Sequence, residues 1–155
     1  KFESALAASL CKCDPKRPVL IESESNKIGA LHLPRILWQQ MRRADYVRVD
    51  APLTVRVSFL LDQYSHIIDQ PEKLDPLLNW VVSRIGHDAV NRWRDYVEKE
   101  DWTGFVQMVL KDHYDPAYDR SAKGRQQTER EVITAERLDS EGIEGLATKL
   151  VEMVK

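Results

Sequence analysis

A polar cluster that could hold phosphate or magnesium follows a short apolar run near the start of the chain. Val19, Leu20 and Ile21 lie between a proline and six polar residues at positions 22–27. Such a run is typical of a strand buried on both faces of a parallel sheet. Open α/β folds bind ligands at the carboxyl ends of their strands, so the polar residues would lie where ligands bind. The candidates for phosphate or magnesium binding in this cluster are Glu22, Glu24, Ser25 and Lys27.

The sequence leaves two interpretations of this cluster open. An acidic residue that closes an apolar strand resembles a Walker B element, whose carboxylate holds Mg²⁺ directly or through water. The same carboxylates and hydroxyls can instead cap a solvated turn. Magnesium is therefore an ion that the cluster could bind, and no intrinsic cofactor is indicated.

Basic and aromatic residues form a second group of candidates. Arg56 joins the phosphate candidates, because the planar guanidinium of arginine suits phosphate oxygens. Other cations could follow a nucleic-acid backbone, and histidine or tyrosine rings could stack on unpaired bases. For each arginine the alternative is a solvated helix face with ion pairs. The residues predicted to contact RNA are Arg35, Arg42, Arg43, His113, Tyr114, Tyr118, Arg120, Lys123 and Arg125.

The composition indicates one globular domain without a membrane role. The chain has 155 residues, of which 43% are hydrophobic, and this suffices for one core. The formal net charge of -2 gives no overall attraction to nucleic acid, so any polyanion must meet a local basic patch. No apolar run approaches the roughly 20 residues that span a bilayer, and no export leader is evident. We therefore expect a cytoplasmic protein with no membrane contact.

Neither a catalytic nucleophile nor a metal site built from histidine or cysteine is indicated. Cys11 and Cys13 fit neither a redox Cys-x-x-Cys motif nor a zinc knuckle. The four histidines are scattered without ligand spacing. The catalytic residues therefore stay unassigned.

Alternating strand and helix patterns predict an α/β fold. Strands are expected at 19–21, 46–50 and 132–135, and helices at 2–13, from Pro34, from Pro52, throughout 71–112 and from a cap at Ser140. This order favours a mostly parallel, doubly wound sheet with an all-helical insertion around 71–112, whose Trp and Leu stripes are core. The segment 113–130 is polar and too long for a simple connector. In the last helix the residues expected to face inward are Ile143, Leu146, Ala147, Leu150, Val151 and Val154.

Several blocks spread over nearly the whole chain resemble one protein family. The match is to the carboxyl-terminal part of the P-loop domain of tRNA 2-selenouridine synthases. Each block is common alone, but their combination is specific. The matching blocks are Glu22-Ser23-Glu24-Ser25, Ile28-Gly29, Leu33-Pro34 with Leu37 and Met41, Val49-Asp50-Ala51-Pro52 with Arg56, and His113-Tyr114-Asp115-Pro116 with Tyr118 and Arg120-Ser121.

The resemblance implies a transferase that acts on the wobble 2-thiouridine of tRNA. Such an enzyme transfers a geranyl group from geranyl diphosphate to the sulfur of the thiouridine, and then replaces the sulfur with selenium from selenophosphate. We therefore expect tRNA as the partner, and geranyl diphosphate and selenophosphate as the co-substrates. Members of the family join a rhodanese-like domain to a P-loop domain. This sequence contains no Gly-x-x-x-x-Gly-Lys-Ser/Thr loop and no rhodanese-type cysteine loop. We expect both segments upstream in the same protein, with residues 1–155 forming the later part of the P-loop domain and inactive alone.

Two other functions stay open. A P-loop kinase relative would place Glu22 on magnesium and Arg56 in a lid over a small substrate. A non-catalytic RNA-binding module would use the basic and aromatic residues alone. The order of a P-loop sheet also predicts a missing strand between those at Val19 and Val47, unless the strands close up.

Overall fold

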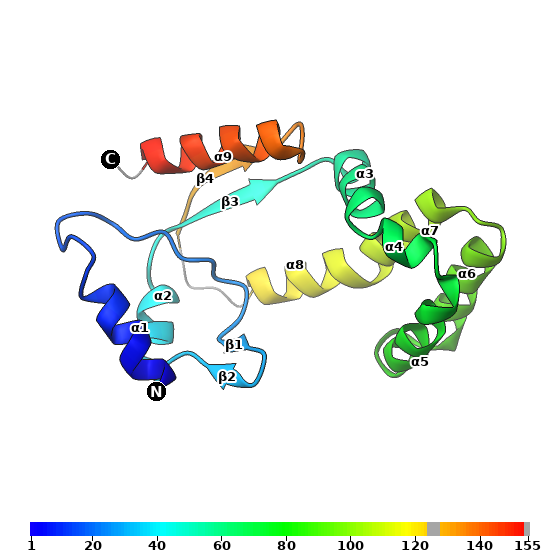
Figure 1. The fold of residues 1–155 in the computed structure, drawn as a ribbon, viewed down its shortest axis with the longest axis horizontal. Coiled ribbons are helices and arrows are strands. Elements are labelled where there is room, and N and C mark those ends of the chain that lie inside the picture. The colour runs from blue at the N-terminus through cyan, green and yellow to red at the C-terminus, as the bar shows by residue number, and fades with distance from the viewer. Residues whose placement is uncertain (124–127, 154–155) are drawn as a thin grey trace. The chain divides into compact units, whose positions relative to one another are not determined.

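The computed structural model describes residues 1–123 and 128–153, and for residues 121–123 it describes the backbone alone. The chain divides into two compact units (Figure 1). Unit 1 comprises Lys1–Val49, Arg125–Ile133 and Glu144–Lys155, and unit 2 comprises Asp50–Gly124 and Thr134–Ile143.

Unit 1 consists of short elements joined by irregular chain. It begins with α1 (Phe2–Leu10), β1 (Lys27–Ile28), β2 (Leu31–His32) and α2 (Arg35–Met41). Three further elements cross the division between the units, namely β3 (Tyr46–Asp50), β4 (Glu129–Thr134) and α9 (Ser140–Met153). The predicted helix at 2–13 ends at Leu10 and none of its residues is buried. The helix expected from Pro34 is confirmed, because Pro34 directly precedes α2.

A tight hairpin lies where the sequence predicted only a polar loop. β1 and β2 pair antiparallel, with Lys27 opposite His32 and Ile28 opposite Leu31. The two-residue connection starts at Gly29, whose φ of 59° lies in the left-handed region. Glycine adopts this conformation without the steric cost that a Cβ imposes, which explains its place at the turn.

β3 and β4 form a parallel pair. The Tyr46 N–H donates to the Thr128 carbonyl at 3.1 Å, and the Ala135 N–H donates to the Asp50 carbonyl at 2.7 Å. The two strands therefore run in the same direction (Figure 1). The predicted strand at 46–50 is confirmed with its bounds, and the one predicted at 132–135 spans 129–134. Glu129 stabilises the pairing, since its carboxylate accepts 3.0 Å hydrogen bonds from the Tyr46 hydroxyl and Arg48 Nε.

The strand predicted at Val19–Ile21 is wrong. This segment has no regular secondary structure, and Val19, Leu20 and Ile21 keep 48%, 48% and 44% of their surface exposed. Strand conformation requires a neighbouring strand for its backbone hydrogen bonds, and within the described ranges β3 pairs with β4 alone. An apolar run without such a partner stays irregular.

Unit 2 is a cluster of helices. Their order is α3 (Leu53–Gln63), α4 (Ser65–Ile68), the 3₁₀ turn η1 (Pro71–Lys73), α5 (Leu74–Ile85), α6 (His87–Glu98), α7 (Trp102–Val109), the π-helical turn η2 (Leu110–Tyr114) and α8 (Asp115–Lys123). The boundaries follow local chemistry. Pro52 precedes α3, Gly86 at φ 87° separates α5 from α6, and the Asp101 carboxylate caps α7 by accepting from the Gly104 N–H at 2.8 Å.

The core of unit 2 is built around Trp93. This side chain is 1% exposed, and it packs with Leu74, Leu78 and Val90. Phe105 lies edge-on to Trp93, with ring centroids 6.4 Å apart. The Trp93 indole N–H donates to the Asp112 carboxylate at 3.3 Å. The predicted helices within 71–110 and the core role of their apolar stripes are therefore confirmed, except that Leu77 is 54% exposed. That these helices form an insertion stays a prediction.

The first part of the polar segment 113–130 is helical. η2 continues directly into α8, and Pro116 occupies the first turn of α8. A proline in a helix lacks an N–H and clashes with the carbonyl four residues earlier. The wider π turn immediately before Pro116 relieves this conflict, so the proline does not end the helix.

The last helix differs from its prediction in its cap and in its buried face. Its cap is Asp139, whose carboxylate accepts from the Gly142 N–H at 3.0 Å, while Ser140 is the first helical residue. No residue within Ser140–Met153 is buried, and Ile143 and Val151 are 47% and 46% exposed. Ala147 is exposed, whereas Leu146 and Leu150 are half-buried. Val154 lies outside the described residues.

Candidate functional site

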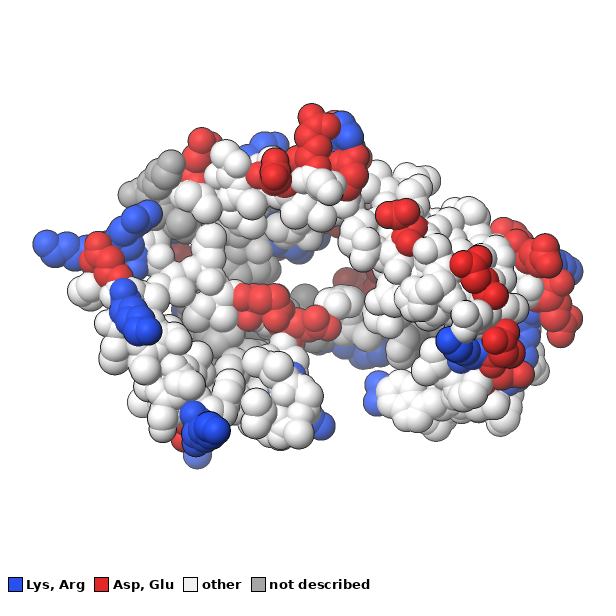
Figure 2. Space-filling model, in the orientation of Figure 1, with Lys and Arg blue, Asp and Glu red and all other residues white. Residues whose placement is uncertain are grey.

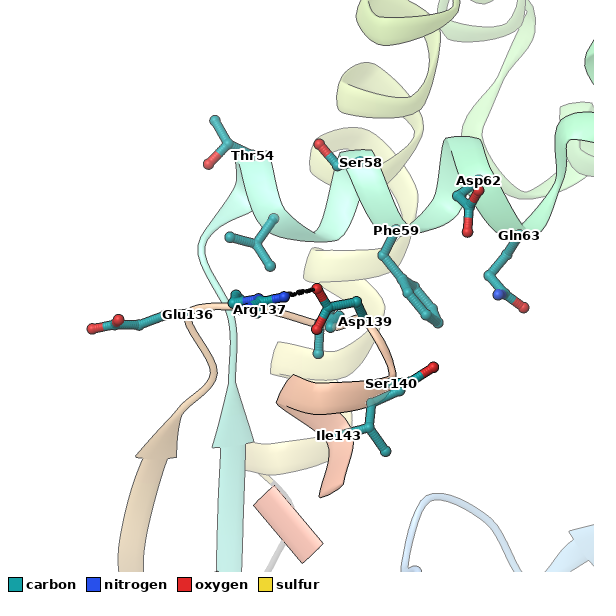
Figure 3. A pocket seen from close by; sticks show the side chains of 12 residues that line it. Thr54, Ser58, Phe59, Asp62, Gln63, Glu136, Arg137, Asp139, Ser140 and Ile143 are labelled. Atoms are coloured by element: carbon teal, nitrogen blue, oxygen red, sulfur yellow. Dashed lines mark hydrogen bonds and ion pairs between the residues drawn. The ribbon is translucent and has the colours of Figure 1, made fainter. Parts of the chain in front are cut away.

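A pocket in unit 2 lies at the carboxyl ends of the parallel strands. It has a volume of about 530 Å³, between α3, which follows β3, and residues 136–140, which follow β4 (Figure 3). Figure 3 shows Phe59 pointing from α3 towards the loop that carries Arg137 and Asp139. Ligands of parallel α/β sheets bind at this edge, so the location is that expected of a ligand site. The remaining lining residues are Thr54, Val55, Ser58, Asp62, Gln63, Glu136, Leu138, Ser140 and Ile143.

The one guanidinium group in the lining of this pocket is already paired with carboxylates. The Arg137 Nε donates to Asp139 at 3.0 Å, and the Arg137 Nη1 lies 3.0 Å from Glu141. The hydrogen bond to Asp139, followed by the charges of Asp139 and Glu141, raises the pKa of Arg137. The same bond from Arg137 and the backbone bond from Gly142 lower the pKa of Asp139. With three carboxylates and one guanidinium in its lining, the pocket does not favour an anionic ligand.

Sequence reasoning did not identify Arg137 and Asp139. The available signal was their position, because they directly follow the last predicted strand and therefore lie at the same sheet edge as the residues after β3. The expected edge residues at 22–27 follow a segment that is not a strand, so the edge is formed by other parts of the chain.

Two of the phosphate candidates make local turn contacts in unit 1. The Glu22 carboxylate accepts a hydrogen bond from the Glu24 N–H, and the Ser25 hydroxyl accepts from the Lys27 N–H at 3.0 Å. These contacts match the alternative in which the polar cluster caps a turn. The role of Glu22, Glu24, Ser25 and Lys27 in phosphate or magnesium binding stays a prediction.

Arg56 is held by Asp115. Its two terminal nitrogens lie 2.6 and 3.1 Å from the two carboxylate oxygens, a bidentate pair that joins α3 to the start of α8. This hydrogen bonding raises the pKa of Arg56 against the opposing effect of burial. Its Nε is buried and has no hydrogen-bond partner within the described ranges. A phosphate on Arg56 would have to displace Asp115, so the pair mainly positions the two helices.

The RNA candidates before residue 50 form an exposed group in unit 1. Arg35 lies in α2, and Arg42 and Arg43 follow its end; all three are exposed. None of them has a carboxylate within 4 Å among the residues that the structure describes. The side chain of Lys123 and all of Arg125 lie outside the described residues.

Two RNA candidates of unit 2 lie in one basic hollow. Its volume is about 610 Å³, and we call it the basic hollow throughout. His113 and Arg120 line it from η2 and α8, together with Arg84 from α5 and Arg92 from α6. The remaining lining residues are Ile85, Ala89, Asp112 and Ala117. Three guanidinium groups therefore face a single carboxylate. The sequence did not single out Arg84 or Arg92, since nothing in the local pattern relates α5 and α6 to α8.

The tyrosine candidates lie beside the hollow. Tyr114 and Tyr118 are 48% and 47% exposed, and their spacing of four residues places them near each other on one face of the helix. The His113 and Tyr114 rings lie 5.2 Å apart in an edge contact. Helix geometry thus brings His113, Tyr114, Tyr118 and Arg120 to adjacent stripes of one helical surface.

Two further observations concern charge on one face of the molecule and metal-binding clusters among the described residues. On the face drawn in Figure 2, side chains of both signs are scattered over both units. No three His, Cys, Asp or Glu side chains gather as metal ligands in the described part of the chain. None of the helices that the structure describes has the length and hydropathy required to cross a bilayer.

Comparisons with known proteins agree on one family. The sequence model of the "tRNA 2-selenouridine synthase AAA domain" matches residues 1–141. A relative from Shewanella loihica, named tRNA 2-selenouridine synthase, is 39% identical over 145 residues, which cover 76% of this chain and 39% of that protein. One of the same name from Nitrosomonas europaea is 33% identical over 115 residues, covering 71% of this chain and 30% of that protein. The chain thus spans at most about two fifths of these relatives. No solved structure matches it.

Proposed function

Because the chain belongs to the tRNA 2-selenouridine synthase family through its AAA domain, we propose that it is part of an enzyme that modifies tRNA. The single observation that carries this proposal is the family match over residues 1–141. The resemblance of the sequence blocks supports the finer reaction, in which the sulfur of a wobble 2-thiouridine is geranylated and then replaced by selenium. Geranyl diphosphate and selenophosphate are the proposed co-substrates.

The described residues would contribute binding surfaces to this reaction. The basic hollow in unit 2 and the exposed arginines of unit 1 are suited to the phosphates of tRNA, because guanidinium groups pair with phosphate oxygens in a planar fork. We further propose that a rhodanese-like segment and a Walker A loop of the same protein complete the site, with these residues as the later part of a P-loop domain. We assign no catalytic residue within this chain.

Selenium incorporation tests the proposal directly. The full-length protein is incubated with 2-thiouridine-containing tRNA, geranyl diphosphate and selenophosphate, and the tRNA is digested and analysed by mass spectrometry. We expect the geranylated intermediate to form with geranyl diphosphate alone, and 2-selenouridine to form only when selenophosphate is also present. Formation of neither product by a folded, tRNA-binding protein would contradict the transferase function.

One alternative has a structural observation in its favour. The basic hollow also suits a non-catalytic RNA-binding module, which would bind tRNA with strong salt dependence and turn nothing over. Nucleotide-dependent phosphate transfer to a small molecule without tRNA would instead indicate a kinase relative. The tRNA analysis identifies the transferase, and an assay of nucleotide-dependent phosphate transfer separates the kinase relative from the RNA-binding module.

A further inference from the structure

We propose that the basic hollow and the neighbouring Trp80 bind an unpaired stretch of RNA, with phosphates in the hollow and a base on the indole ring. This inference rests on the proposed function, since it specifies where and in which form the tRNA would be bound. It adds three contacts that sequence patterns did not identify, Arg84, Arg92 and Trp80.

The charge of the hollow favours a polyanion. Arg84 and Arg120 have no carboxylate within 4 Å in the described part of the chain. Arg92 lies 3.5 Å from the Asp112 carboxylate, which is long for a charge-assisted hydrogen bond. Asp112 also accepts a 3.3 Å hydrogen bond from the buried Trp93 indole, so part of its hydrogen-bonding capacity is already used within the core. An entering phosphate would therefore meet guanidinium groups with free donors.

The aromatic residue beside the hollow favours RNA over a small phosphate compound. Trp80 is 61% exposed, although an indole normally contributes to a core. The Arg84 guanidinium lies 4.3 Å from the centre of its ring, which links the indole to the rim of the hollow. An exposed aromatic ring next to a group of cations is the arrangement that binds single-stranded nucleic acid, because each base has a face for stacking.

The geometry of paired RNA fits this surface less well. Duplex RNA hides its base faces inside the helix and is recognised through its shape, phosphates and 2′-hydroxyls. A stacking contact with Trp80 requires a base that is neither paired nor stacked between neighbouring bases. The occupant is therefore an unpaired loop rather than a stem.

The test measures tRNA binding by the full-length protein at several salt concentrations. The double variant Arg84→Glu with Arg92→Glu reverses two exposed charges of the hollow, and Lys99→Glu makes the same type of change at an exposed position after α6. We expect the dissociation constant of the double variant to rise at least tenfold. The slope of log affinity against log salt should become shallower by about 1.4, at about 0.7 for each lost single-strand phosphate contact. Lys99→Glu should change affinity less than about twofold.

A second pair of variants tests the stacking contact without a change of charge. Trp80→Ala should weaken binding of an unpaired RNA oligonucleotide by on the order of tenfold and leave the salt slope unchanged. Trp80→Phe retains an aromatic face and should recover most of the affinity. Circular dichroism of every variant confirms that the fold is intact, as expected for exposed side chains.

The outcomes separate this inference from the enzyme assignment. Normal tRNA affinity and salt slope in the double variant would overturn the inference, even if the wild-type protein forms 2-selenouridine. The inference would also be overturned if the double variant bound RNA normally but bound inorganic diphosphate more weakly than the wild type. The hollow would then be a site for a small phosphate compound. If the wild-type protein modifies no tRNA, the enzyme function fails, while the binding measurements still decide the role of the hollow.

Discussion

In unit 2, Trp93 and Val90 keep 1% and 0% of their surface exposed, whereas in unit 1 Val19, Leu20 and Ile21 keep at least 44%. Both sets are apolar and both come from regular sequence patterns. A helix satisfies its backbone hydrogen bonds within itself and needs only nearby helices to bury its stripe. A strand depends on other strands for the same bonds. The contrast shows that the helices of unit 2 bury their apolar residues against neighbouring helices, whereas the apolar run at 19–21 has no strand to pair with in the described part of the chain.

The largest effect is expected from Trp93→Ala in the core of unit 2. This change removes a buried indole and should destabilise unit 2 by about 3–5 kcal/mol, because the surrounding helices cannot close the cavity. Urea unfolding followed by circular dichroism measures it. The control is Trp80→Ala, which removes an equally large but exposed ring and should cost under about 1 kcal/mol. Equal losses of stability for both tryptophans would contradict the claim that the buried ring contributes more to unit 2 than the exposed one.

A smaller effect is expected when the ion pair of Arg56 is removed. Arg56→Ala should destabilise unit 2 by about 1–2 kcal/mol, below the cost for a fully buried pair because water reaches about a third of each side chain. Thermal unfolding provides the measurement. Arg56→Lys should recover little, since an ammonium group cannot make the two parallel bonds.

A more exposed ion pair in unit 1 provides the comparison for the Arg56 prediction. Arg48 Nε lies 3.0 Å from the Glu129 carboxylate, and the two side chains are 51% and 37% exposed, more than the Arg56 side chain at 31%. Arg48→Ala should therefore cost less than Arg56→Ala. A larger loss from Arg48→Ala would show that the β3–β4 pairing, rather than the helical cluster, depends on its charges.

A pH-dependent effect is expected at the start of α9. The folded-state pKa of Asp139 is lowered from its ordinary value of 3.8 by Arg137 and the Gly142 N–H. Its contribution to stability is therefore full above about pH 4 and is lost as the pH falls through the lowered folded pKa. Asp139→Asn should lower the melting temperature slightly at pH 7 and reduce the loss of stability below pH 4. Identical acid profiles for variant and wild type would contradict this cap.

The smallest effect is expected in the irregular segment of unit 1. Leu20→Ser should change the free energy of unfolding by less than about 0.5 kcal/mol, because the side chain is already half in contact with water. The same substitution at Leu78, in the core of unit 2, serves as the positive control. A loss above about 2 kcal/mol from Leu20→Ser in the full-length protein would mean that this segment is buried against other parts of it.

Local patterns predicted much of the fold. The strand at 46–50 and the helices after Pro34 and Pro52 were correct because their signals, alternating residues and a proline before the first turn, lie within the elements themselves. Val19–Ile21 was assigned to a strand from hydrophobicity alone, which does not reveal whether a neighbouring strand is present. The α8 helix was missed because a polar segment with Asp115-Pro116 is typical of a loop, and the π turn that admits this proline has no sequence signature.

The candidate sites were harder to predict than the elements. His113 and Arg120 were proposed because basic and aromatic residues are concentrated in the polar segment that begins at residue 113, and the structure places both in the lining of one hollow. Arg84 and Arg92 were missed because they approach that surface only through the packing of α5 and α6 around Trp93. Arg56 was recognised as a notable cation, but its partner Asp115 lies 59 residues away, beyond any local pattern.

The π turn at η2 accommodates one residue more than an α-helical turn. It does so without adding the rotation and the rise that this residue would contribute in an α-helix. If residues 110–114 relaxed to α-helical geometry, α8 would rotate by about 100° and advance by about 1.5 Å along its axis. Asp115 would then swing away from Arg56, and His113 and Arg120 would turn out of the basic hollow. The π-helical conformation of η2 therefore determines which side of α8 faces Arg56 and the basic hollow.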